Sequence, residues 1–411
     1  MRQEDIHAYF EKQRDWVTNL LSDVCAIPSE SGSEIPAQTF FEKKMFDING
    51  LKVTEAPISN SIKDDPEYAY PVRNLDYTDR FNLILEKPAE SGGKVLALNT
   101  HIDVVPPSAE QIDPYIPKVD EEGRLWARGA CDAKGQAVAM ALLCKAACEL
   151  DECKNGITGH LVVEEEIGGN GTVAMLRHCP DFKADVMVNM EPTGLRIQPS
   201  IRGAIWFDFL FKGVAGHAGS SQNTSSATDK AIAAVSLLKN YHKELLAKSK
   251  DYGLFVGMPN PMPLTIGMFQ AGVWPAMVPD HARIAGVLGF LPNTNKETVI
   301  KEITDIFNRE ENKWISDGMT VDFVYRHNAV ETDPEHWFVK GMSAACEKCG
   351  ISGVPTAMTA SSDGIYYQEI GIPTMAFGPG LISDAHSVHE YVKIDDVIKA
   401  AEVLYEFYRS M

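Results

Sequence analysis

Val163-Glu164-Glu165-Glu166-Ile167-Gly168-Gly169 sets three adjacent carboxylates between an apolar run and a glycine turn. The apolar residues before it are typical of the end of a buried strand, and the glycines are typical of the loop after one. Adjacent carboxylates repel each other and raise each other's pKa unless a cation neutralises them. In an open α/β sheet, this edge is where chemistry usually takes place. The stretch therefore indicates either a metal site or a solvated acidic turn.

A second strand end carries a histidine and an aspartate. The apolar run of residues 94–100 predicts a buried strand, which delivers His101 and Asp103 at its carboxyl end. Two residues apart in an extended segment, these side chains point to the same face. They are either part of a site or a core histidine hydrogen-bonded to an aspartate, and the pair alone does not distinguish the two.

Two further carboxylates follow predicted elements of the same region. Asp132 precedes an almost wholly apolar helix over residues 136–150, which indicates a helix buried within its domain. The electropositive helix N-terminus favours a carboxylate there, either as an N-cap or as a bridge between two cations. The strand over residues 184–190 ends in Glu191. Four strand ends or loops with ligand-type side chains are hard to explain by chance, so together they favour a metal site.

The order of the predicted elements indicates two domains, as the length of 411 residues also suggests. Strands alternate with helices over residues 1–195 and again over 329–411, which is typical of a mainly parallel α/β sheet covered by helices on both faces. Residues 196–328 instead predict an inserted α+β domain, because their strands have one covered face. The other expected elements are a helix over 4–26, a surface loop over 56–80, strands over 204–212, 281–290, 320–325 and 374–377, and helices over 228–249, 296–308 and from 394.

Composition excludes several classes of partner. Lys and Arg number 38 against 57 Asp and Glu, a net charge of −19, so we expect neither nucleic acid nor an anionic membrane surface as a partner. The N-terminal residues lack the apolar core of a signal peptide and no run reaches the length of a membrane span, so we expect a cytoplasmic protein. Cys346-x-x-Cys349 has zinc-site spacing but no second pair, so we expect no structural zinc there.

Five motifs, taken together and in this order, resemble the di-zinc aminoacylase and carboxypeptidase family, which includes acetylornithine deacetylase and succinyl-diaminopimelate desuccinylase. The motifs are HIDVVP (101–106), ARGACDAKG (127–135), EEEIGG (164–169), NMEPT (189–193) and AHSVHEYV (385–392). Each motif alone is weak, but five in register cover nearly the whole chain. The resemblance implies a zinc-exopeptidase-like catalytic domain with an inserted lid or dimerisation domain.

By that resemblance, two divalent metal ions bind at the strand ends. His101 and Glu191 would hold one ion, Glu166 and His386 would hold the other, and Asp132 would bridge both. Two histidines and three carboxylates suit zinc, with cobalt or manganese as alternatives.

The resemblance also assigns two roles next to the ions. Glu165, the middle carboxylate of its motif, would be the general base that takes a proton from water and later delivers it to the leaving amine. Asp103 would be the carboxylate that fixes the tautomer and ring angle of His101.

A histidine of the inserted domain completes the expected site. In the family such a histidine donates a hydrogen bond to the oxyanion in the partner subunit's site. The matching residue is His217, in Gly213-Val214-Ala215-Gly216-His217-Ala218-Gly219 before a Ser220-Ser221 turn. We therefore expect a homodimer that forms through the inserted domain. His281 and His389 are more typical of structural or rim residues.

One position departs from the family pattern. Family members that bind an α-carboxylate usually carry an arginine on a strand of the inserted domain, where this chain has Val287. Arg283 lies on the same strand face by period 2 and is the candidate substitute. Recognition of a substrate carboxylate is therefore left open.

The function expected from this set is hydrolysis of the amide bond of a small N-acyl amino acid or related N-acyl compound. A dipeptidase or carboxypeptidase with the same chemistry is the alternative. A non-catalytic metal-binding scaffold is a third hypothesis, but a scaffold has no use for a spare base such as Glu165.

Overall fold

The computed structural model describes residues 2–150, 153–219 and 222–411, and the chain divides into two compact units. The first unit comprises Met1–Tyr68, Val72–Ile201 and Val330–Met411, and the second comprises Ala69–Pro71 and Arg202–Ala329. The second unit begins a few residues later than the predicted insert, and it includes a short segment of the predicted surface loop. The predicted Ser220-Ser221 turn lies outside the described residues.

The first unit is built on a six-stranded mixed sheet of order β1-β2-β6-β3-β7-β17. Its strands are β1 (Lys52–Pro57), β2 (Phe81–Lys87), β3 (Val95–His101), β6 (Gly156–Val162), β7 (Val186–Asn189) and β17 (Thr374–Ala376). Strands β6, β3, β7 and β17 are parallel, and β2 and β1 add antiparallel pairs at one edge. The predicted fold class, a mainly parallel sheet covered by helices, is confirmed.

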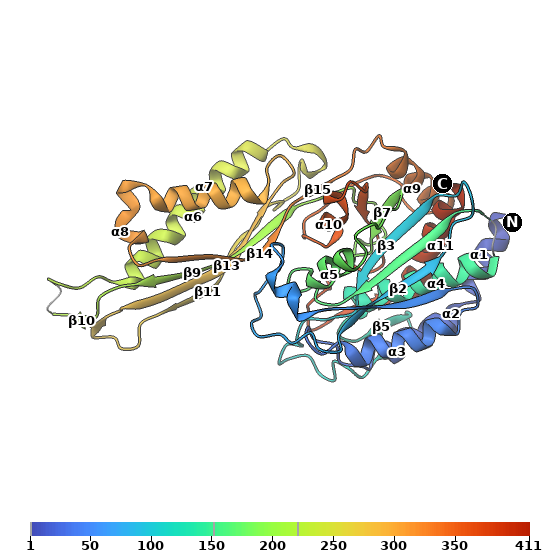
Figure 1. Cartoon of the computed structure of the whole chain (residues 1–411), viewed down its shortest axis with the longest axis horizontal. Coiled ribbons are helices and arrows are strands. Elements are labelled where there is room, and N and C mark those ends of the chain that lie inside the picture. The colour runs from blue at the N-terminus through green and yellow to red at the C-terminus, as the bar shows by residue number, and fades with distance from the viewer. Residues whose placement is uncertain (1, 151–152, 220–221) are drawn as a thin grey trace. The chain divides into compact units, whose positions relative to one another are not determined.

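Helices cover both faces of this sheet (Figure 1). They include α4 (Gly135–Leu150), α5 (Asn170–His178), α10 (Gly364–Glu369) and α11 (Ile394–Ser410). Gly159 of β6 lies against Met140 of α4, whereas Val162, three residues further on, packs with Met175 of α5. Since successive strand residues alternate between faces, α4 and α5 lie on opposite faces of the sheet. α10 packs on β7 and β17, and α11 packs on α4.

The predicted single helix over residues 4–26 is wrong, because two helices form there. α1 (Gln3–Glu11) ends and α2 (Arg14–Cys25) begins across Lys12 and Gln13. The break allows α1 to pack on α11 while α2 contacts both α4 and α11. It falls at two polar residues, so it sacrifices no apolar burial.

The predicted surface loop over residues 56–80 is only partly correct. It starts with the last residues of β1 and contains a short 3-10 helix, Asn60–Asp64. Tyr77, near its end, is fully buried and its hydroxyl donates a hydrogen bond to Glu164 at 2.6 Å. This loop therefore supplies part of the surroundings of the acidic stretch.

The second unit is a four-stranded antiparallel sheet of order β11-β13-β9-β14, with two helices packed against it (Figure 1). Its elements are β9 (Gly203–Lys212), β11 (Leu264–Ala271), β13 (His281–Phe290), β14 (Thr320–His327), α6 (Ala227–Ser249), α7 (Lys296–Asn308), α8 (Lys313–Ser316) and a two-residue ladder of β10 (Gly216–His217) with β12 (Met277–Val278). On β9, Phe207, Phe209 and Phe211 are buried and alternate with more exposed side chains. Phe209 contacts Phe307 of α7, so the buried face is the helix-covered one.

Short elements complete the first unit. They are α3 (Ile35–Phe46), α9 (Trp337–Lys348), a sheet of β18 (Tyr391–Lys393), β5 (Arg124–Trp126) and β4 (Lys118–Val119), and a sheet of β15 (Val330–Glu331), β8 (Ser200–Ile201) and β16 (Ala357–Met358). Within the described residues, no helix has both the length and the apolar character that crossing a membrane requires.

Candidate metal centre

Three parallel strands deliver predicted ligands to one edge of the first unit's sheet. β3 ends at His101, β6 is followed by Glu165 and Glu166, and Glu191 stands two residues after β7. Because the carboxyl ends of neighbouring parallel strands lie at the same edge, these side chains converge.

Asp132 lies between two histidines. Its Oδ1 is 3.1 Å from Nε2 of His101, and its Oδ2 is 3.3 Å from Nε2 of His386. Nε2 of His386 is also 2.9 Å from Oε1 of Glu166. Donor atoms of His101, Asp132 and Glu166 all lie within 4.8 Å of one another, and the described part of the chain has one such group of three. A carboxylate that turns one oxygen toward each imidazole has the arrangement that a bridging ligand needs.

The other two predicted carboxylates border this cluster. Glu191 is buried, and its Oε1 accepts a hydrogen bond from Nδ2 of Asn189 at 2.9 Å. Burial and the charge of Asp132 raise the pKa of Glu191 well above its ordinary value. Glu165 is largely buried, and burial together with the charges of Glu191 and Asp363 raises its pKa well above the usual range. No hydrogen bond to the Glu165 carboxylate is present among the described residues.

The chemistry of this donor set fits a divalent cation. Two imidazoles face four carboxylates, those of Asp132, Glu165, Glu166 and Glu191. Burial alone would lower the pKa of His386, but hydrogen bonds to Asp132 and Glu166 outweigh burial and raise it to about 11. The acidic surroundings therefore strongly favour positive charge at this point. Imidazole nitrogen and carboxylate oxygen are also the ligands that zinc takes in proteins.

Glu164, the first of the three adjacent carboxylates, has a structural role. Its φ of +60° turns it away from its two neighbours. Its carboxylate accepts hydrogen bonds from Tyr77 at 2.6 Å and from Nδ2 of Asn170 at 3.0 Å, and it pairs with the buried guanidinium of Arg80. Arg80 also binds both carboxylate oxygens of Glu34 at 2.8 Å. The charge of Glu164 is thus neutralised inside the protein, and only Glu165 and Glu166 reach the cluster.

Asp103 contacts both His101 and the acidic turn. Nδ1 of His101 is 2.9 Å from the Asp103 carbonyl oxygen and 3.4 Å from its Oδ1. The carboxylate accepts hydrogen bonds from the backbone N–H groups of Glu165 and Glu166, at 3.1 and 3.2 Å, and from the hydroxyl of Ser31 at 2.9 Å. Beside the predicted contact with His101, the structure therefore gives Asp103 a second contact, with the turn that carries Glu165.

Glu390 is a site residue that the sequence analysis did not identify, although it lies in the AHSVHEYV motif. Its Oε1 accepts hydrogen bonds from the backbone N–H groups of Gly129, Cys131 and Asp132, at 2.9, 3.1 and 3.2 Å. Its other oxygen pairs with Arg128, and both side chains are buried. Glu390 therefore holds the segment that presents Asp132. Its partners are remote in sequence, so no local pattern indicated this role.

The buried Arg128–Glu390 pair yields a stability prediction. Arg128→Met leaves the Glu390 carboxylate buried without its counter-charge, so we expect the free energy of unfolding to fall by about 3–5 kcal/mol. Urea denaturation of metal-free protein measures the change. The control is Lys301→Met, which breaks an exposed ion pair with Asp305 and should leave the free energy of unfolding nearly unchanged. If the free energy of unfolding falls equally in the two variants, burial does not make the Arg128–Glu390 pair more important for stability than an exposed pair.

His217 lies in the second unit, on β10, where it pairs with Met277 of β12. It is exposed, and its Nδ1 accepts a hydrogen bond from the backbone N–H of Gly219 at 3.1 Å. The predicted metal ligands and Glu165 all belong to the first unit. The approach of His217 to a metal centre therefore stays a prediction.

The candidate substitute for the missing arginine already has a partner. Nε and Nη2 of Arg283 donate to the two carboxylate oxygens of Asp208 on the neighbouring strand, at 2.8 and 2.7 Å. This pairing disfavours Arg283 as a binder of substrate carboxylate. His281 is exposed and pairs with Asp280, and His389 is also exposed.

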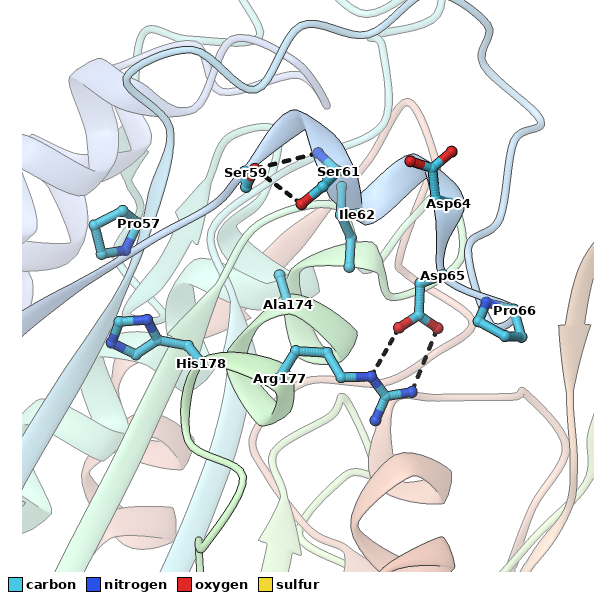
Figure 2. Close-up of a pocket in the computed structure, with 10 residues that line it drawn as sticks. All are labelled: Pro57, Ser59, Ser61, Ile62, Asp64, Asp65, Pro66, Ala174, Arg177 and His178. Carbon is cyan, nitrogen blue, oxygen red and sulfur yellow. Dashed lines mark hydrogen bonds and ion pairs between the residues drawn. The ribbon is translucent and has the colours of Figure 1, made fainter.

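A pocket of about 490 Å³ lies elsewhere in the first unit (Figure 2). It is lined by Pro57 at the end of β1, by residues of the following loop and by Ala174, Arg177 and His178 of α5. Figure 2 shows Arg177 engaged by Asp65, with Nε of Arg177 2.7 Å from Oδ2 of Asp65. None of the predicted site residues lines this pocket, so we do not assign the reaction to it.

Sequence and structure comparisons relate this chain to known proteins. The sequence model described as Peptidase family M20/M25/M40 matches residues 97–410. N-formyl-4-amino-5-aminomethyl-2-methylpyrimidine deformylase of Bacillus subtilis (strain 168) is 26% identical over 375 residues, which cover 84% of this chain and 82% of that protein. Acetylornithine deacetylase of Myxococcus xanthus is 26% identical over 327 residues, covering 79% and 83%. The crystal structure of human carnosine dipeptidase 1 matches with a TM-score of 0.75 at 16% identity, covering 99% of each chain, and so shares the fold.

Proposed function

Because the chain belongs to peptidase family M20/M25/M40, whose members are metal-dependent hydrolases, we propose that it hydrolyses the amide bond of a small N-acyl amino acid or related N-acyl compound. The observation that carries this proposal is Asp132 between His101 and His386, with the Glu165 carboxylate beside them. Asp132, His101 and His386 would be needed by any metal site. A free carboxylate such as that of Glu165 is needed only if the site carries out a reaction.

Two divalent ions would be held by the residues at the strand ends. His101 and Glu191 would hold one, Glu166 and His386 the other, and Asp132 would bridge them, with zinc favoured and cobalt or manganese as alternatives. When bound, such ions polarise a carbonyl group and acidify a water molecule.

Glu165 supplies the proton transfers in this proposal. Its carboxylate is held by the turn rather than by hydrogen bonds of its own, so both oxygens can accept a proton. Burial raises its pKa, which makes it a stronger base than an exposed glutamate. The same carboxyl group then delivers the proton to the leaving amine.

His217 is proposed as the donor to the oxyanion. The Gly219 N–H donates to Nδ1 of His217, so in the neutral ring Nε2 carries the hydrogen. An N–H group directed at the developing oxyanion would stabilise the transition state.

A homodimer through the second unit is proposed to bring His217 to the partner's site. β11 is an edge strand of the second unit's sheet, and its Met268 and Phe269 are 40% and 45% exposed. Exposed apolar side chains on an edge strand form a surface that a second copy of this chain can cover. Two-fold dimers are the commonest closed assembly.

The substrate class is tested with a panel of compounds. N-acetyl, N-formyl and N-succinyl amino acids, dipeptides and N-acyl amines without a carboxylate are offered to the metal-loaded protein. The proposal predicts turnover of N-acyl compounds, and higher turnover of dipeptides would support the dipeptidase alternative. Since Val287 replaces the usual arginine and Arg283 is paired with Asp208, the carboxylate-free compounds decide whether a substrate carboxylate is needed. No hydrolysis by protein with full metal content would refute the proposal.

Metal content gives a second prediction. We expect two equivalents per chain, because five ligand-type residues exceed what one tetrahedral ion uses. Elemental analysis of protein purified without chelator measures the stoichiometry. His386→Ala should lower it toward one. Full activity at a saturating stoichiometry of one would rule out the bridged pair of ions.

A further inference from the structure

The turn that carries Glu165 and Glu166 is held from two sides. On one side, Asp103 accepts hydrogen bonds from the backbone N–H groups of both glutamates. On the other side stand Asp363, directly before α10, and Tyr366 within it. The Tyr366 hydroxyl donates to the carbonyl oxygen of Gly168 at 2.9 Å.

Asp363 lies directly against the glycine that ends this turn. It is fully buried, and its Oδ2 accepts a hydrogen bond from Oγ1 of Thr172 at 2.6 Å, in the first turn of α5. A Cβ atom added to Gly169 would lie 2.2 Å from Oδ1 of Asp363 and 2.6 Å from Cε2 of Tyr366. Gly169 also has a φ of +72°, which side chains disfavour. The turn and the start of α10 therefore fit together only with glycine at this position.

The burial of the Asp363 carboxylate is unfavourable for folding. Its Oδ1 has no hydrogen-bond partner within the described residues, although the side chain is fully buried. Such an atom disfavours folding, and native proteins retain few of them. The charge of Asp363 also contributes to raising the pKa of Glu165 and of Glu191. No predicted motif contains it.

We propose that Asp363 is a positioning residue, which together with Tyr366 fixes the Gly168–Gly169 turn and thereby holds the Glu165 carboxylate in place for proton transfer. The inference rests on the proposed function. Proton transfer requires heavy atoms about 2.6–3.2 Å apart, and a displacement of about 1 Å costs on the order of 10²-fold in rate. Because the Glu165 carboxylate has no hydrogen bond of its own among the described residues, its position depends on the backbone of this turn.

Substitutions on the α10 side test the proposal by steady-state kinetics. Asp363→Ala should lower kcat on the order of 10²-fold and change KM by less than about threefold. Asp363→Asn should stay within about tenfold of the wild-type kcat, since an amide can donate to or accept from the Thr172 hydroxyl. Tyr366→Phe should lower kcat about tenfold. An Asp363→Asn variant as slow as Asp363→Ala would show that charge is required, and positioning would be excluded.

Two further variants separate positioning from general damage to the fold. Gly169→Ala pushes the turn away from α10 from the opposite side, and it should reproduce the kcat loss of Asp363→Ala. Tyr367→Phe is the matched control, because Tyr367 is the next residue and its hydroxyl bonds Asn99 and His160 rather than the turn. It should change kcat by less than about threefold. Equal losses in Tyr366→Phe and Tyr367→Phe would contradict the proposal.

A readout without catalysis uses Co²⁺ added to metal-free protein. Glu166 is carried by the same turn, so Asp363→Ala and Gly169→Ala should change the visible absorption bands of bound Co²⁺, whereas Tyr367→Phe should not. Unchanged bands together with a kcat within threefold of wild type would overturn the inference. If the wild-type protein hydrolyses none of the panel compounds, the proposed function fails, and the Co²⁺ bands alone still decide whether Asp363 positions the turn.

Discussion

Replacing Glu165 by glutamine is expected to lower turnover by a factor on the order of 10² to 10⁴ while both metal ions stay bound. Glutamine keeps the size and hydrogen-bonding capacity of the side chain but cannot accept a proton. Since no hydrogen bond to the Glu165 carboxylate is found in the described part of the chain, the substitution removes a base without removing a structural contact. Steady-state kinetics and elemental analysis of the same preparation measure both effects.

The neighbouring carboxylate provides the control. Glu166 lies 2.9 Å from His386, so Glu166→Gln should release one of the two ions. If Glu165→Gln loses metal and Glu166→Gln keeps both ions with low turnover, the roles of the two residues are reversed. If Glu165→Gln retains wild-type turnover, the proton transfers do not pass through this residue.

The residues at the strand ends could be predicted because each of them is positioned by the strand that directly precedes it in sequence. An apolar run predicts a strand, and the residue after the run lies at the carboxyl edge wherever that strand sits in a parallel sheet. His101, Glu166 and Glu191 each follow such a run, and β3, β6 and β7 are neighbours. Sequence order and spacing were therefore sufficient to collect them at one edge.

The residues that hold these ligands could not be predicted in this way. Glu390 supports Asp132 across 258 positions of sequence, and Asp363 meets Thr172 across 191. A single carboxylate in a loop is more often exposed or a cap than a buried acceptor. The sequence around Glu390 and around Asp363 does not specify which residue each one contacts, so these contacts are identified only from the folded chain.

Other errors have the same origin. Tyr77 lies in a polar stretch that predicts a surface loop, yet its burial depends on a hydrogen bond to Glu164, which lies 87 positions further along the chain. The strand β11 was missed because its residues are mostly exposed and do not alternate between buried and exposed positions. Periodicity reports burial, so an edge strand with little burial gives no periodic signal.

The second large effect concerns His217. His217→Ala should lower turnover on the order of 10²- to 10³-fold, because the oxyanion loses a donor. The loss alone does not show which subunit the donor serves. His217 and Glu165 lie in different units of the chain, so a complementation experiment can separate action in the same chain from action across a dimer.

Mixing His217→Ala chains with Glu165→Gln chains is expected to restore activity that neither variant has alone. If His217 acts across the dimer, one site of each hybrid combines the intact Glu165 of the first chain with the intact His217 of the second. Random exchange makes half of the dimers hybrids, and half of their sites are intact, so activity should approach about a quarter of wild type. Subunit exchange is monitored with a tagged chain.

A matched mixture controls for unspecific recovery. Chains with Glu165→Gln and chains with Glu166→Gln carry both changes in the first unit, so every site of their hybrids contains one defective carboxylate and no activity should return. Recovery in this control would mean that the effect does not come from shared sites. If exchange is complete and the His217→Ala mixture stays inactive, His217 serves its own chain or has no part in the reaction. Recovery confined to the His217→Ala mixture would establish that each active site is built from two chains, because no single chain in the mixture carries both intact residues.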